Sequence, residues 1–183
     1  MGGPSATPCI ARRDLLGLGL TGFAALALPR FAAARTPSSS AASTGLGHEL
    51  AGSEFVYISP FRSDGSESKC HGEVWYGWLD DAVVIVTSKT TWKARALQRG
   101  LDQARVWVGN HGRWKTWYGG RNEQFRSAPS FRAQAEFTRE PELLERLMAL
   151  YATKYPDEFD DWGPRQRAGI ADGSRILIRY RSA

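Results

Sequence analysis

Residues 82–100 read AVVIVTSKTTWKARALQRG, and the order of residue types in this segment indicates the architecture. The unbroken apolar run from Ala82 to Val86 predicts a strand over Ala82–Thr87 that is buried on both faces. A short helix is expected over Thr91–Arg99, closed by Gly100, which can adopt the left-handed conformation that ends helices. A buried strand therefore leads through a polar junction, Thr87 to Thr91, into a short helix.

Alternating apolar and polar residues predict further strands on both sides of this segment. A strand over His71–Leu79 should form a hairpin with Ala82–Thr87 through the tight turn Asp80-Asp81. After Pro141, apolar residues at helical spacing predict an amphipathic helix that ends near Pro156. These elements together predict a mainly β protein, a small antiparallel barrel with appended helices. The remaining expected strands are Glu54–Ser59, Arg105–Val108, Phe131–Thr138 and a last one around Ile176–Tyr180.

Composition excludes several classes of protein. The chain has 183 residues, 42% hydrophobic and 23% charged, which is typical of a globular domain and not of a disordered or collagen-like chain. The formal net charge is +5, but the arginines are scattered, so nucleic acid is not an expected partner. Three histidines and two cysteines leave little material for a metal site, and we predict none. The acidic run Asp157–Asp161 is expected to be a solvated loop, because it lacks calcium-loop spacing.

The N-terminus has the features of an export signal. Arg12-Arg13 precedes the apolar run Leu15–Leu28, whose helix would span about 21 Å, too short for a stable membrane anchor. Ala32–Ala34 provides an A-x-A cleavage site. We therefore expect a signal peptide over residues 1–34, a disordered leader over 35–52 and the folded domain over 53–183.

The segment Ala11–Leu16 resembles a twin-arginine signal, and an ordinary secretory signal is the alternative. The resemblance implies recognition by the bacterial twin-arginine export machinery and a periplasmic or secreted location. That route carries proteins already folded, often around a cofactor.

The polar junction after the buried strand is the densest candidate site. Lys89 and Lys93 are four residues apart and would repel each other on one helical face, so a bound anion would relieve their repulsion. Ser88, Thr90 and Thr91 add hydroxyl groups there. The alternative is an ordinary helix cap, with Thr90 or Thr91 capping and the lysines solvated.

The order of strands and the Thr-Ser-Lys-x-x-x-Lys motif resemble the flavin-binding split-barrel superfamily, which includes pyridoxamine phosphate oxidase-like proteins and deazaflavin-dependent reductases. The resemblance implies an antiparallel split β-barrel with one short and one longer helix. It also implies that Thr87, Ser88, Lys89 and Lys93 bind the phosphate of FMN, or of a deazaflavin, in a homodimer with cofactor sites between the subunits. The resemblance does not extend to Gly109–Ser130.

The function implied by the resemblance is an exported flavin- or deazaflavin-dependent oxidoreductase that acts on a small-molecule substrate. No catalytic acid or base is indicated. The alternative is a periplasmic β-barrel without enzymatic activity, which binds a small molecule or has an empty cofactor site. The seven tryptophans could stack on a flat ring or pack in the core, and Trp114 and Trp117 are the best candidates for a ligand contact because they lie in a glycine-rich segment.

Overall fold

The structure is a computed structural model that describes residues 39–113 and 122–183. The predicted signal peptide, residues 1–34, and the two candidate tryptophans Trp114 and Trp117 lie outside the described residues. Among the residues described, no helix is both long enough and apolar enough to cross a membrane.

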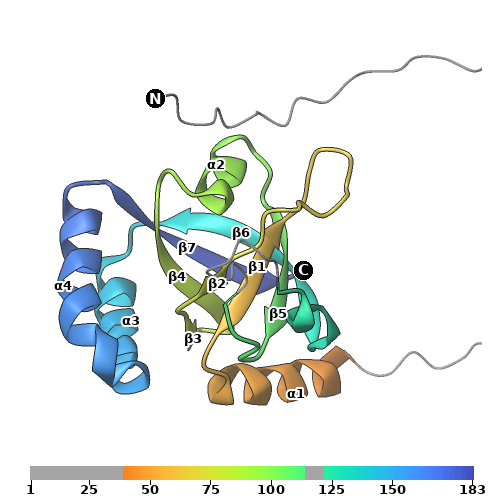
Figure 1. The fold of residues 1–183 in the computed structure, drawn as a ribbon, viewed down its shortest axis with the longest axis horizontal. Coiled ribbons are helices and arrows are strands. Elements are labelled where there is room, and N and C mark those ends of the chain that lie inside the picture. Colours follow the sequence, from red (N-terminus) through yellow and green to blue (C-terminus); the bar gives the residue numbers. More distant parts are fainter. Residues whose placement is uncertain (1–38, 114–121) are drawn as a thin grey trace, which may run out of the picture. The chain divides into compact units, whose positions relative to one another are not determined.

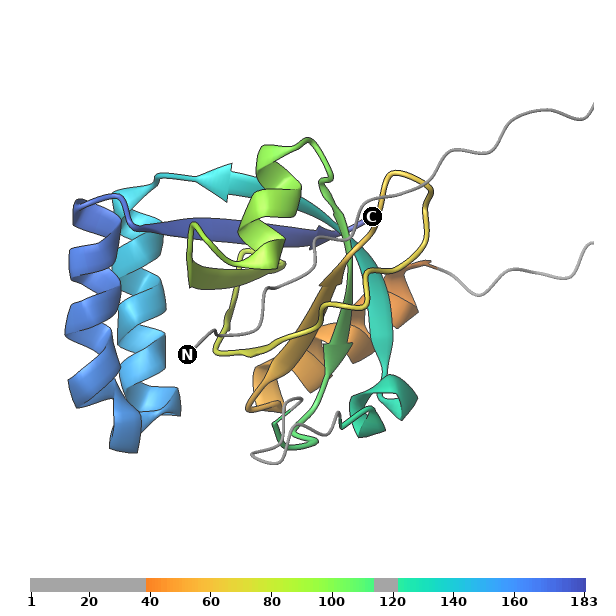
Figure 2. The ribbon, with the colours of Figure 1, turned by 45° about the horizontal axis from the view of Figure 1, so that its top comes forward.

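The described strands form one antiparallel sheet of seven strands in the order β2-β1-β5-β6-β7-β4-β3. The sheet curls into a barrel-like layer (Figures 1 and 2). Two helices lie against one side of it, α3 (Pro141–Lys154) and α4 (Pro156–Ala171), and two lie at its ends, α1 (Ser39–Gly52) and α2 (Trp92–Gln98). The expected mainly β architecture with appended helices is confirmed. The strands are β1 (Val56–Pro60), β2 (Glu73–Val74), β3 (Gly77–Leu79), β4 (Ala82–Ser88), β5 (Gln103–Val108), β6 (Ser130–Thr138) and β7 (Arg175–Ser182).

Strand β4 is buried on both faces, as its apolar run predicts. Its odd-numbered residues Val83 and Ile85 belong to an interior cluster that also contains Ile58, Val106 and Ile178. Its even-numbered residues belong to a helix-side cluster between the sheet and α3, made by Ala82, Val84, Val86, Leu143, Leu147, Met148 and Leu177. Because side chains alternate along a strand, each residue of β4 is assigned to one cluster by its parity.

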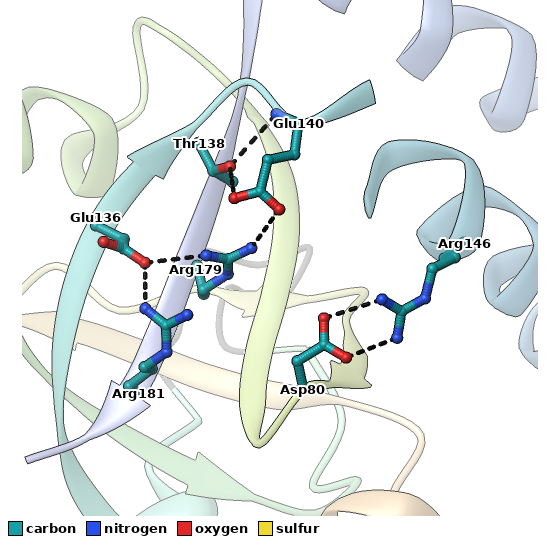
Figure 3. Close-up of polar contacts among 7 residues, drawn as sticks. All are labelled: Asp80, Glu136, Thr138, Glu140, Arg146, Arg179 and Arg181. Atoms are coloured by element: carbon teal, nitrogen blue, oxygen red, sulfur yellow. Dashed lines mark hydrogen bonds and ion pairs between the residues drawn. The ribbon is translucent and has the colours of Figure 1, made fainter. Parts of the chain in front are cut away.

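A tight turn joins β3 to β4, as expected. Both of its central residues have positive φ angles, 52° at Asp80 and 55° at Asp81, which match a turn that follows the twist of a hairpin. Arg146 of α3 donates two hydrogen bonds to the Asp80 carboxylate, at 2.9 and 2.8 Å (Figure 3). This ion pair holds the hairpin against α3 and lowers the pKa of Asp80.

The single strand expected over His71–Leu79 is interrupted between β2 and β3. At the interruption, the Tyr76 N–H donates to the Tyr155 hydroxyl at 3.1 Å, and the Tyr76 hydroxyl donates to the Leu50 carbonyl at 2.6 Å. Trp75 stacks on the Tyr155 ring with centroids 4.3 Å apart. These aromatic contacts use the backbone and side chains that would otherwise continue the strand.

The helices differ from expectation at two places. Helix α3 (Pro141–Lys154) is confirmed, but residues 157–161, expected as an acidic loop, lie in a second helix, α4 (Pro156–Ala171). That prediction is wrong because Pro156 takes the first helical position and acidic residues favour the positive end of the helix dipole.

The second difference is helix α1 (Ser39–Gly52), which occupies most of the segment that the sequence predicted as a disordered leader over 35–52. Leu50 is buried in the interior cluster, and its carbonyl accepts the Tyr76 hydrogen bond. Leu50 therefore packs the last turn of α1 against the barrel.

Candidate functional site

The candidate site lies where β4 meets the short helix α2 (Trp92–Gln98). Thr87 is 6% exposed and has the parity of the interior cluster. Its hydroxyl lies 3.2 Å from the Thr91 hydroxyl, which donates to the Ser88 carbonyl at 2.9 Å. Hydroxyl groups can rotate their hydrogens toward a new acceptor, so this pair can serve an anion.

Ser88 and Lys89 do not lie with Thr87. Ser88 has the parity of the helix-side residues of β4, and its hydroxyl is 3.0 Å from that of Thr90. Lys89 is exposed and reaches the turn between α4 and β7, where a Cβ added to Gly173 would lie 3.4 Å from the Lys89 Nζ. The structure therefore separates two of the four predicted phosphate ligands from the other two.

Lys93 lies in different surroundings from Lys89. Its Nζ reaches the segment before β2, where a Cβ added to Gly72 would lie only 3.2 Å away. The side chain is half-buried, and burial lowers the pKa of Lys93 from 10.5 to about 8. Within residues 39–113 and 122–183, the Lys93 ammonium has no hydrogen bond or ion pair.

Two features remain at the junction of β4 and α2: the paired hydroxyls of Thr87 and Thr91, and the Lys93 side chain, whose Nζ reaches Gly72. Thr91, the residue before α2, was named among the hydroxyl groups of the junction but not among the four phosphate ligands that the resemblance implies. The spacing of four residues between Thr87 and Thr91 is a signal for this contact, because one turn of chain after the end of a strand can bring the two side chains together. The hydrogen bond between the hydroxyls is the direct observation.

The histidine, cysteine and tryptophan side chains do not form a second candidate site among the described residues. His71 is buried, and its Nε2 lies 2.8 Å from an Arg126 nitrogen, while Cys70 is exposed. The part of the chain that the structure describes contains no group of three or more His, Cys, Asp or Glu able to hold a metal ion. Trp75 and Trp107 pack against other aromatic rings, whereas Trp162 is 42% exposed.

Comparison with known proteins supports the fold through structure and not through sequence. No protein-family model matches the chain, and no curated protein matches its sequence. Among solved structures, the conserved hypothetical protein Rv2991 of Mycobacterium tuberculosis matches with a TM-score of 0.50 and 18% identity, over 80% of this chain and 81% of that one. The fold is a split β-barrel.

Two further solved structures resemble this split barrel. The heme storage protein HutZ of Vibrio cholerae matches with a TM-score of 0.50 and 12% identity, over 76% of this chain and 89% of that one. A Listeria innocua protein provisionally named pyridoxamine 5'-phosphate oxidase matches with a TM-score of 0.48 and 9% identity, over 77% and 93% of the two chains. At 18% and 12% identity, the similarity to Rv2991 and HutZ shows a shared fold and not a shared function.

Proposed function

We propose that the protein is an exported oxidoreductase of split-barrel type that uses FMN, or a deazaflavin, and that Lys93, Thr87 and Thr91 bind the cofactor phosphate. The observation that carries this proposal is the half-buried Lys93 ammonium, which has no partner in the described part of the chain. Ser88 and Lys89 are left out of the proposed phosphate site because they lie on another side of β4.

A lysine that loses water without gaining a partner destabilises the folded chain, so its position needs a compensating contact. A phosphate would supply one, since an ammonium–phosphate hydrogen bond is stronger than a bond between neutral groups. The two threonine hydroxyls could donate to the same phosphate after rotating their hydrogens. The residues present therefore fit the phosphate of a flavin nucleotide.

When bound, the flavin would supply the hydride or electron transfer, and the chain would supply binding and orientation. The Ala11–Leu16 motif supports export after folding, so that a cofactor acquired in the cytoplasm would accompany the chain. We further propose a homodimer that acts on a small-molecule substrate.

The test compares FMN with riboflavin, which has the same ring system but no phosphate. The full chain is purified from the cytoplasm, and binding of each flavin is followed by absorbance and fluorescence. We expect FMN to bind more tightly than riboflavin, and Lys93→Met to remove about ten- to a hundredfold of that preference, the range expected for one charged hydrogen bond. The matched control is Lys89→Met, which removes an equal charge from the other side of the junction and should keep the preference.

Three results would contradict the proposal: no binding of FMN or a deazaflavin, equal affinity for FMN and riboflavin, or equal losses in the two lysine variants. Uptake of heme in place of a flavin would also overturn it. If FMN binds but no electron donor reduces it, the chain is a binding protein without oxidoreductase activity.

A further inference from the structure

A cavity of about 660 Å³ lies outside the proposed phosphate site, where the end of β6 and the start of β7 meet α3 and α4. Figure 2 shows these strand ends reaching the helix pair. Its walls are largely apolar, with Phe137, Leu144, Ile170, Ile176 and Leu177 among them. Small-molecule sites commonly have volumes of about 300–1,000 Å³ and apolar linings, so this cavity has a suitable size and surface.

Three cationic side chains line the cavity: Lys89, Arg139 and Arg175. Arg175 is held in place by neutral groups. Its stem crosses α4 at Gly169, where an added Cβ would lie 2.5 Å from the Arg175 Cδ, and its Nη1 donates to the Gln166 Oε1 at 3.3 Å. No described carboxylate forms an ion pair with any of the three cations.

The nearby carboxylates do not neutralise this set of cations. Glu140 lines the cavity, but its Oε2 accepts a hydrogen bond from Arg179 at 2.9 Å, and its Oε1 accepts one from Thr138 at 3.2 Å (Figure 3). Asp172 accepts the Ser174 N–H at 2.8 Å and lies near enough to Lys89 and Arg175 for both to lower its pKa. Asp172, which lies beside the cavity and not in its lining, is therefore the one nearby carboxylate without an ion pair among the described residues, against three cations.

We propose that this cavity binds a small organic anion with an apolar body, of the medium-chain carboxylate class. The apolar walls would bury the chain of such a molecule, and the fixed Arg175 guanidinium, whose planar fork matches a carboxylate, would bind its head group. The proposal does not depend on the flavin, because the cavity and the Thr87, Thr91 and Lys93 set contain different residues.

The test uses decanoate, with decan-1-ol as the uncharged probe of similar length. Binding to the full chain is measured by calorimetry, without flavin and with FMN added. We expect decanoate to bind at least about tenfold more tightly than decan-1-ol, and Arg175→Gln to remove that advantage, a change of about 1.4 kcal/mol per factor of ten. Gly169→Ala should also weaken decanoate binding, because it displaces the Arg175 stem.

The control is Arg165→Gln, which removes the same charge at an exposed residue of the neighbouring helix α4 that does not line the cavity. Lys89→Gln serves as a second cavity variant in case Arg175→Gln does not fold. Equal binding of decanoate and decan-1-ol overturns the proposal, as does an equal loss in the Arg165 control. A shift of oligomeric state in Leu144→Trp, with no binding of decanoate to the unmodified chain, would instead assign the cavity to contact with a second copy.

Discussion

Replacing Lys93 with methionine should stabilise the protein at neutral pH. Methionine keeps much of the apolar stem of lysine and removes the ammonium, which is half-buried without a partner in the described residues. The fall in the pKa of Lys93 from 10.5 to about 8 corresponds to about 3 kcal/mol at about 1.4 kcal/mol per pKa unit. Because water still reaches part of the side chain, we expect a gain of about 2 kcal/mol in the free energy of unfolding.

The gain should depend on pH in one direction. Below about pH 8, Lys93 is protonated in both the folded and the unfolded chain, and the folded chain carries the full desolvation penalty. Between about 8 and 10.5, the folded chain loses this proton while the unfolded chain retains it, so the stability of the unmodified protein rises with pH. The advantage of Lys93→Met should therefore shrink toward zero across this window.

The measurement is urea unfolding of both chains without flavin or phosphate, from pH 6.5 to 10. The control is Lys89→Met, which removes an exposed ammonium and should change stability by less than about 0.5 kcal/mol at every pH. A stability difference for Lys93→Met that does not vary with pH, or a variant less stable than the unmodified chain at pH 7, would refute the reasoning.

Two further predictions concern the fold. Asp81→Gly should raise the free energy of unfolding by about 0.5–1 kcal/mol, because residue 81 has a φ of 55° that glycine adopts without strain; thermal unfolding would measure it. Gly77→Ala should destabilise the protein by about 1–3 kcal/mol, because the added Cβ would lie 2.6 Å from the Cδ1 of the buried Leu147; an unchanged urea midpoint would show that α3 moves away at little cost.

The strands were predictable where local sequence and tertiary packing agree. The apolar run of β4 needs two buried faces, and Asp80-Asp81 suits the turn that precedes it, so both signals specify the same hairpin. The interruption between β2 and β3 could not be foreseen, because it depends on Tyr155, which is distant in sequence.

Helix α4 was missed because its own residues argue against a helix. Gly163, Pro164 and Gly169 all disfavour helical interiors. Side-chain contacts explain both glycines: a Cβ at Gly163 would lie 2.6 Å from the Phe159 ring one turn earlier in α4, and one at Gly169 would meet Arg175 of β7. Propensity alone does not report such contacts.

The sequence indicates the polar junction after β4, but it does not show which of the junction's side chains the fold brings together. The alternation of β4 already implies that Thr87 and Ser88 point to opposite faces, so one phosphate site could not use both side chains. The separate directions of Lys89 and Lys93 depend on Gly173 and Gly72, whose positions only the folded chain reveals.

The position of β7 has a consequence for how the protein is made. This strand runs from Arg175 to Ser182 near the end of the chain, yet it lies between β6 and β4 and joins β4-β3 to the rest of the sheet. During synthesis, β4 can pair with β3 at once, but it cannot pair with β7 until Arg175–Ser182 has been made, so closure of the sheet depends on contacts that are distant in sequence. Any premature stop before Arg175 would leave two half-sheets with open edges, prone to aggregate and easily recognised by proteases.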